Sequence, residues 1–206
     1  MRLEANCLGT MLALLAGLTS FAALAQVTGD PAKGADVAGK LCVACHGADG
    51  NSLVPNFPKL AGQHAEYLLK QLQDFKSKRR QTETMAPQIA ELSADDMANL
   101  AAHFARQKSA PGAAKDPKLA AAGKKLYDNG NPASGVAACG SCHGAGGAGS
   151  AQYPRLAGQH AEYATAELKA YAAGKRKNDQ QVMRAIAAQM TEQEIAAVAQ
   201  YIASLP

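Results

Sequence analysis

The spacing of apolar and polar residues in this 206-residue chain predicts several helices, and no stretch alternates with the period of two that a half-buried strand shows. The pattern therefore predicts an all-α protein. We expect helices over residues 33–45, 63–78, 94–107, 117–128, 160–173 and 192–204. Ser93 and Thr191 each come just before a predicted helix and are followed three residues later by a carboxylate, which is the pattern of a capping box.

The second half of the chain repeats the first. The segment Pro58–Tyr67 returns as Pro154–Tyr163 with one conservative change, Lys to Arg, and both copies lead into a helix. Residues 109–118 have the composition of a linker. We therefore predict two tandem domains of one duplicated type, residues 26–108 and 119–206. Each is small enough that its core would be limited without a bound apolar group.

Residues 1–25 have the organisation of a secretory signal peptide. Arg2 precedes an apolar stretch, Leu8–Leu24, and cleavage is predicted after Ala25. Glycine, serine and threonine interrupt the stretch, and this argues against a membrane anchor, which needs about 20 apolar residues. Cys7 would leave with the signal. We expect export to the periplasm as a soluble monomer, either free or peripherally associated with the membrane.

The formal net charge is +4, and loss of Arg2 and Glu4 with the signal would leave it unchanged. The basic segments Lys76–Arg80 and Lys175–Lys177 are short, and we interpret them as solvated helix ends. So mild a charge, without a larger basic cluster, argues against nucleic-acid binding.

Two Cys-x-x-Cys-His motifs carry the candidate chemistry: Cys42, Cys45 and His46 in the first, and Cys139, Cys142 and His143 in the second. This is the attachment signature of c-type haem, in which two thiols reach one edge of the porphyrin and the adjacent imidazole reaches the iron. A single zinc site would be expected to keep its cysteine pairs closer together, and a redox disulfide would need a βαβ context. The motifs thus predict two covalently bound haem c groups, with no disulfide in the mature chain.

The sixth iron ligand would decide between electron transfer and catalysis, because methionine favours ferrous iron and closes the site to substrates. When Ser93 is aligned with Thr191, Met85 falls opposite Met183, eight residues before each cap. Met97 and Met190 fall opposite aliphatic residues, as core positions would. We therefore predict Met85, expected in a loop, and Met183 as the sixth ligands.

Histidines offer an alternative ligand set, because His64 and His160 also recur in the repeat. We favour surface or supporting roles for these two, and a helix-face role for His103. A ligating histidine usually donates its second ring N–H to a carbonyl. Pro58 and Pro154 could supply those carbonyls, although both prolines could equally be simple turn residues.

Taken together, the paired Cys-x-x-Cys-His-Gly motifs, the Pro-x-Leu-Ala-Gly-Gln-His-Ala-Glu-Tyr repeat, the paired methionines and the closing helices resemble cytochrome c4. These are di-haem, two-domain class I cytochromes c. The resemblance implies His/Met ligation at both irons, haem edges that face each other at the domain interface, and no enzymatic activity. It also implies electron transfer from a cytochrome bc complex to a haem–copper terminal oxidase. A di-haem peroxidase, or a di-haem subunit of a sulfide- or thiosulfate-oxidising enzyme, is the alternative. The glycine-rich segment 144–149, where the first copy has Asp49-Gly50-Asn51, departs from the repeat.

Overall fold

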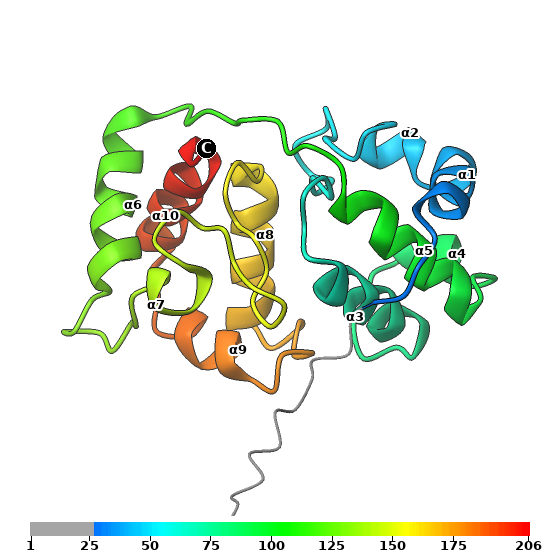
Figure 1. Ribbon diagram of the computed structural model, residues 1–206. Helices are drawn as coiled ribbons and strands as arrows, with labels where there is room; N and C mark the ends of the chain where they lie inside the picture. The colour runs from blue at the N-terminus through cyan, green and yellow to red at the C-terminus, as the bar shows by residue number, and fades with distance from the viewer. Residues whose placement is uncertain (1–26) are drawn as a thin grey trace, which may run out of the picture.

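The computed structural model describes residues 27–206, so the predicted signal peptide and Cys7 lie outside the described residues. Two helical domains lie side by side, and the connection between them runs along one edge of the molecule (Figure 1). The first contains α1 (Pro31–Leu41), α2 (Val43–His46), α3 (Ala65–Lys76), α4 (Met85–Ile89) and α5 (Ala94–Ala105). The second contains α6 (Pro117–Asn129), α7 (Gly140–His143), α8 (Ala161–Ala172), α9 (Val182–Ala187) and α10 (Glu192–Ser204).

The all-α prediction is confirmed: between residues 27 and 206 the structure holds no strand, only an isolated bridge between Asn131 and Val136. Both predicted capping boxes form. The Ser93 and Thr191 side chains accept from the backbone N–H groups of Asp96 and Glu194, whose carboxylates return the bond. These caps satisfy backbone donors that would otherwise lack partners at the start of α5 and α10.

Each domain is built on one close helix crossing, of α1 with α5 and of α6 with α10. Glycine makes both crossings possible. A Cβ atom on Gly34 would lie 2.1 Å from the carbonyl oxygen of Asn99, and one on Gly123 would lie 2.0 Å from that of Ala197. Because no side chain fits at those distances, the two helices of each pair approach at backbone contact.

The first core gathers buried apolar side chains from α1, α3, α4 and α5, with Leu100 and Ala101 almost inaccessible to solvent. The second core is built around Tyr127 of α6 and Val198 of α10. Met97 is buried in the first core and Met190 packs against the second, as expected for packing residues.

The structure differs from the predicted helices in two places. The helix expected over residues 33–45 breaks at Cys42, so the haem motif occupies a separate short helix, α2. Met85 does not lie in a loop: it is the first residue of α4, and its N–H is 3.0 Å from Thr82 Oγ1. The polar residues before Met85 indicated a loop, but this local bond starts a helical turn.

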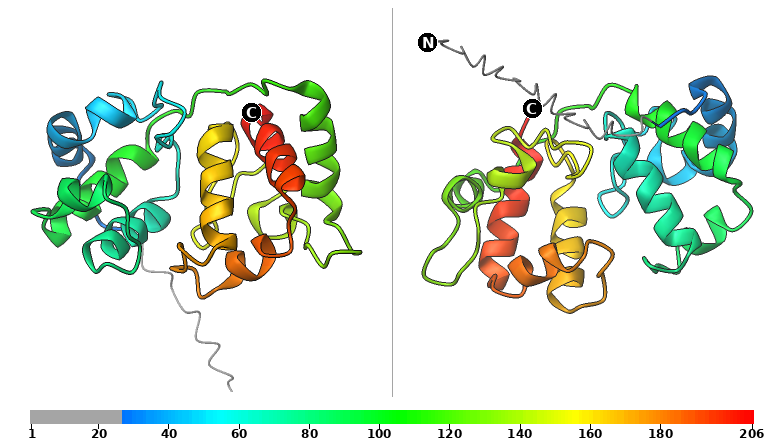
Figure 2. Two further views of the ribbon diagram at one scale, coloured as in Figure 1. Left: turned by 180° about the vertical axis from the view of Figure 1, so that it is seen from behind. Right: turned by 60° about the horizontal axis from the view of Figure 1, so that its bottom comes forward.

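The segment between the domains is held by contacts with both. Asn51 binds it twice, at Ala110 N (2.7 Å) and Lys108 O (3.0 Å), and Gln200 accepts from Lys115 N at 2.7 Å. Views from other directions show the same side-by-side arrangement, with α3 and α8 on the facing sides (Figure 2). None of the helices among residues 27–206 has the length and hydropathy needed to cross a membrane.

Candidate haem sites

The two Cys-x-x-Cys-His motifs fold into equivalent single turns. In the first, the N–H of His46 donates to the Cys42 carbonyl at 2.9 Å; in the second, that of His143 donates to Cys139 at 3.0 Å. Each turn ends at a glycine with positive φ, Gly47 at 78° and Gly144 at 77°, a conformation that glycine adopts without strain. Because residues three and four apart share one face of a helical turn, the two cysteines and the histidine of each motif lie on the same side of the chain.

Both imidazoles are buried, with 6% of each residue exposed, and both contact a proline carbonyl. His46 Nδ1 lies 2.8 Å from Pro58 O, and His143 Nδ1 lies 3.0 Å from Pro154 O. A carbonyl can only accept, so Nδ1 is the donor and Nε2 of the neutral ring keeps its lone pair. Burial lowers the pKa of both rings and outweighs the bond to the carbonyl, which acts to raise it. The lowered pKa favours the neutral imidazole, the form that binds metal.

Within residues 27–206 the four cysteines form no disulfide. Cys42 packs against the first core and Cys139 against the second. Burial, with a smaller contribution from the neighbouring cysteine, raises the pKa of the Cys42 thiol and of the Cys139 thiol to about 11. The two cysteine pairs belong to different domains, as two separate haem sites require.

These features fit haem c. In each domain one short turn carries two cysteines and a buried histidine with an available Nε2, and its first cysteine packs against the apolar core. An aromatic ring lies close to each histidine: Phe57, 6.4 Å from the His46 ring, and Tyr153, 6.0 Å from that of His143. Cys42, Cys45 and His46 would hold one group, and the matching residues of the second motif the other.

The predicted methionine ligands lie on matching short helices. Met85 of α4 is half-buried and packs against the core that Cys42 also contacts. Met183, the second residue of α9, is also half-buried. Both remain candidates for the sixth position.

This architecture is similar to that of known proteins. The cytochrome c family model matches residues 31–107 and again 120–206. A cytochrome c4 of Thiocapsa roseopersicina is 51% identical over 89% of this chain and 96% of its own length. The structure of reduced recombinant cytochrome c4 from Pseudomonas stutzeri superimposes with a TM-score of 0.83 at 41% identity, over 86% of this chain and all of that one.

The chain belongs to the cytochrome c4 family. A further relative, a thiosulfate dehydrogenase electron acceptor of Stutzerimonas stutzeri, is 40% identical over 84% of this chain and 82% of its own. The predictions of two tandem cytochrome c domains and of two covalently bound haem c groups are therefore confirmed. As a member of this family, the chain is a di-haem electron-transfer protein.

The structure gives the repeated histidines of this cytochrome c4 a role that sequence reasoning missed. His64 Nε2 lies 2.8 Å from the Ala148 carbonyl, and His160 Nε2 lies 2.9 Å from the Ser52 carbonyl. Each histidine therefore reaches from one domain into a loop of the other. The near-symmetry of these contacts reflects the duplication, which was the available signal in the sequence.

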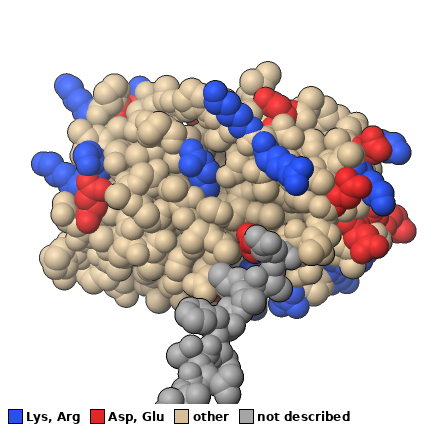
Figure 3. All heavy atoms as spheres, in the orientation of Figure 1, with Lys and Arg blue, Asp and Glu red and all other residues tan. Residues whose placement is uncertain are grey.

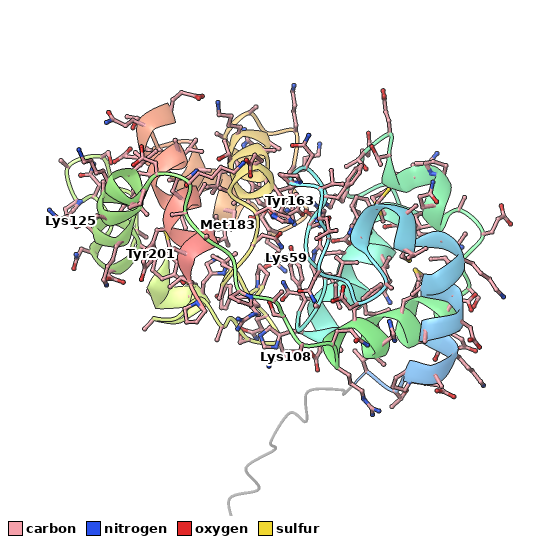
Figure 4. The ribbon with its side chains drawn as sticks, turned by 90° about the horizontal axis from the view of Figure 1, so that it is seen from above. Lys59, Lys108, Lys125, Tyr163, Met183 and Tyr201 are labelled. Atoms are coloured by element: carbon pink, nitrogen blue, oxygen red, sulfur yellow. The ribbon has the colours of Figure 1, made fainter. Side chains whose placement is uncertain are left out.

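The basic segments also meet at the interface of this cytochrome c4, and their interpretation as solvated helix ends was wrong for Arg80 and Arg176. Both are 7% exposed. Glu167 of α8 lies between them, with one oxygen 2.9 Å from Arg80 and the other 2.5 Å from Arg176. The arginines also cross the interface to tyrosine hydroxyls, Arg80 to Tyr163 at 3.0 Å and Arg176 to Tyr67 at 2.9 Å. Lys59 and Tyr163 mark the boundary in the view from above (Figure 4).

This charged cluster is asymmetric, because the position of Glu167 is occupied by Gln71 in the first domain. Burial acts to raise the pKa of Glu167, but the two arginines outweigh it and hold that pKa below its usual value. The carboxylate is therefore ionised at neutral pH and joins the two domains electrostatically.

Proposed function

We propose that this cytochrome c4 is a periplasmic electron carrier in which His46 and Met85 hold one iron and His143 and Met183 hold the other. The observation that carries the proposal is the pair of buried imidazoles with Nδ1 on a proline carbonyl. That contact fixes the tautomer and raises the basicity of a ligand. When bound, each haem supplies an iron that exchanges one electron. The carbonyls of Pro58 and Pro154 would orient the histidines.

Methionine as the sixth ligand is supported by the matched positions of Met85 and Met183 before equivalent capped helices. Thioether ligation stabilises ferrous iron and leaves no open position for a substrate. The alternative ligands, His64 and His160, each have Nε2 within hydrogen-bond distance of a carbonyl of the opposite domain. We therefore infer a carrier and not an enzyme.

We infer that the donor is a cytochrome bc complex and the acceptor a haem–copper terminal oxidase, after export with cleavage behind Ala25. The family resemblance supports this route. On the face shown in Figure 3, basic side chains are scattered and do not form one broad patch. With a formal net charge of +4, exchange with a partner should weaken only modestly with salt.

A second candidate role is favoured by one observation, the 40% identity to a thiosulfate dehydrogenase electron acceptor. In that case the donor would be an enzyme that oxidises thiosulfate. Mixing the oxidised holoprotein with a bc complex and quinol, or with a thiosulfate dehydrogenase and thiosulfate, distinguishes the two. Rapid haem reduction should occur with the first pair; reduction by the second pair alone would reassign the donor.

Replacement of Met85 tests the ligand assignment. Met85→Ala should leave the haem attached, because the thioethers and His46 are untouched. It should also open that iron to carbon monoxide and lower its reduction potential. Met183→Ala should do the same for the second haem, whereas Met97→Leu, in the buried core, should do neither. Unchanged carbon monoxide binding and potential in Met85→Ala would make Met85 a packing residue and refute the assignment.

A further inference from the structure

Two glutamines of the repeated segment exchange hydrogen bonds across the domain interface. Gln159 binds both backbone groups of Lys59: its Oε1 accepts from Lys59 N at 2.9 Å, and its Nε2 donates to Lys59 O at 3.0 Å. Gln63 binds Arg155 in the same way, with Oε1 2.8 Å from Arg155 N and Nε2 3.0 Å from Arg155 O. Each glutamine thus pairs with one residue of the opposite domain as a neighbouring strand would.

The residue that Gln159 binds follows Pro58 directly. The Pro58 carbonyl and the Lys59 N–H are therefore the two polar groups of a single peptide unit. The carbonyl side accepts from His46 Nδ1 at 2.8 Å, while the N–H side donates to Gln159 at 2.9 Å. One peptide plane thus connects the side chain of one domain with the histidine of the other.

The mirror arrangement is complete. The Pro154 carbonyl accepts from His143 Nδ1 at 3.0 Å, and the N–H of the same peptide, on Arg155, donates to Gln63 at 2.8 Å. Gln63 is 7% exposed, so water does not compete effectively for this bond. Each axial histidine candidate is thus connected, through one peptide unit, to a glutamine of the opposite domain.

Such a chain of bonds has an electronic consequence. The peptide unit is conjugated, so an acceptor on its N–H side increases electron density on its carbonyl oxygen. Chains of hydrogen bonds strengthen one another cooperatively, by roughly 10–30% per bond. A stronger bond at the carbonyl draws more on the Nδ1 proton and makes the imidazole a more basic ligand. A more basic ligand stabilises ferric iron and lowers the potential.

We propose that Gln159 and Gln63 are positioning residues that lower the reduction potential of the haem in the opposite domain, through the peptide that holds its axial histidine. This rests on the proposed axial roles of His46 and His143. It makes the docked interface part of each redox centre, so that separation of the domains would raise both potentials.

The test uses the full di-haem protein with Gln159→Leu and Gln63→Leu, which remove the amide. The potentials of the two haems are measured separately, by redox titration followed through the NMR signals of each haem. Gln159→Leu should raise the potential of the haem on Cys42 and Cys45. Gln63→Leu should raise that of the other. We expect roughly a two- to tenfold change in the oxidation equilibrium, where tenfold corresponds to 59 mV for one electron.

The crossed pattern separates this role from a structural one. Each glutamine oxygen also accepts from the next backbone N–H in its own domain, at 3.1 Å for His64 and 3.0 Å for His160. A local effect would therefore shift the haem of the substituted domain. Asn178→Ala is the control, because it removes interdomain bonds to Gln71 (3.0 Å) and Asp74 (2.7 Å) without touching either peptide. It should shift neither potential.

A second readout is the NMR signal of the His46 Nδ1 proton in the reduced protein, which should move upfield in Gln159→Leu as its bond weakens. Shifts in the same domain, equal shifts of both haems, or no shift would overturn the proposal. Failure of the proposed axial role would be seen differently. If His46 is not an axial ligand, His46→Ala will keep the low-spin, histidine-ligated spectrum, whatever the glutamine variants do.

Discussion

Replacement of Glu167 by glutamine should destabilise the docked protein by about 3 kcal/mol. Glu167 is the carboxylate between Arg80 and Arg176, each only 7% exposed, at 2.9 Å and 2.5 Å. Removing one partner of a buried ion pair costs roughly 3–5 kcal/mol, because it leaves a buried charge without compensation. We expect the lower end, since the Glu167 side chain is 21% exposed and the arginines keep their tyrosine partners.

The assay is thermal unfolding of the holoprotein at neutral pH, followed at the haem absorption and by circular dichroism. If both domains unfold together, a loss of about 3 kcal/mol lowers Tm by roughly 6–12 °C in a unit of this size. Glu162→Gln on the same helix is the matched control. Its partner Lys115 is 70% exposed, so that pair should contribute at most about 1 kcal/mol. Equal effects of the two variants would refute the idea that the interface charge cluster stabilises docking.

Three further outcomes are expected. The two arginines lower the folded-state pKa of Glu167 against the effect of burial. The ionised carboxylate therefore stabilises the fold above its ordinary pKa of 4.5, and this contribution is lost as the pH falls through the folded-state pKa. Measurement of Tm against pH should show this loss in the native protein and not in Glu167→Gln. Gly123→Ala should destabilise the second domain by roughly 1–3 kcal/mol or more in denaturant unfolding, since its Cβ would lie 2.0 Å from Ala197 O; an unchanged midpoint would contradict the close helix crossing. His64→Phe should cost about 1 kcal/mol of stability, for one lost hydrogen bond, and leave both haem spectra unchanged; an altered spectrum would return His64 to the list of iron ligands.

Features that depend on short-range chemistry were predictable from the sequence alone. The spacing of Cys42, Cys45 and His46 is set by covalent attachment to one porphyrin edge, so the motif predicts a haem site without knowledge of the fold. The caps at Ser93 and Thr191 use backbone donors within the same turn, and both formed as predicted. The duplication indicated two like domains because each copy carries its own motif and closing helix, with one linker between the copies.

What only the tertiary structure decided are the roles that depend on how the two domains dock. In the sequence, Arg80 and Arg176 belong to runs of basic residues that resemble solvated helix ends, and nothing local shows that Glu167 will lie between them. Gln63 and Gln159 likewise repeat without indicating a partner. Their partners lie in the other domain, 92 and 100 residues away along the chain. Such pairings are set by the packing of two finished surfaces, because a side chain acquires its burial and its partners only when those surfaces meet.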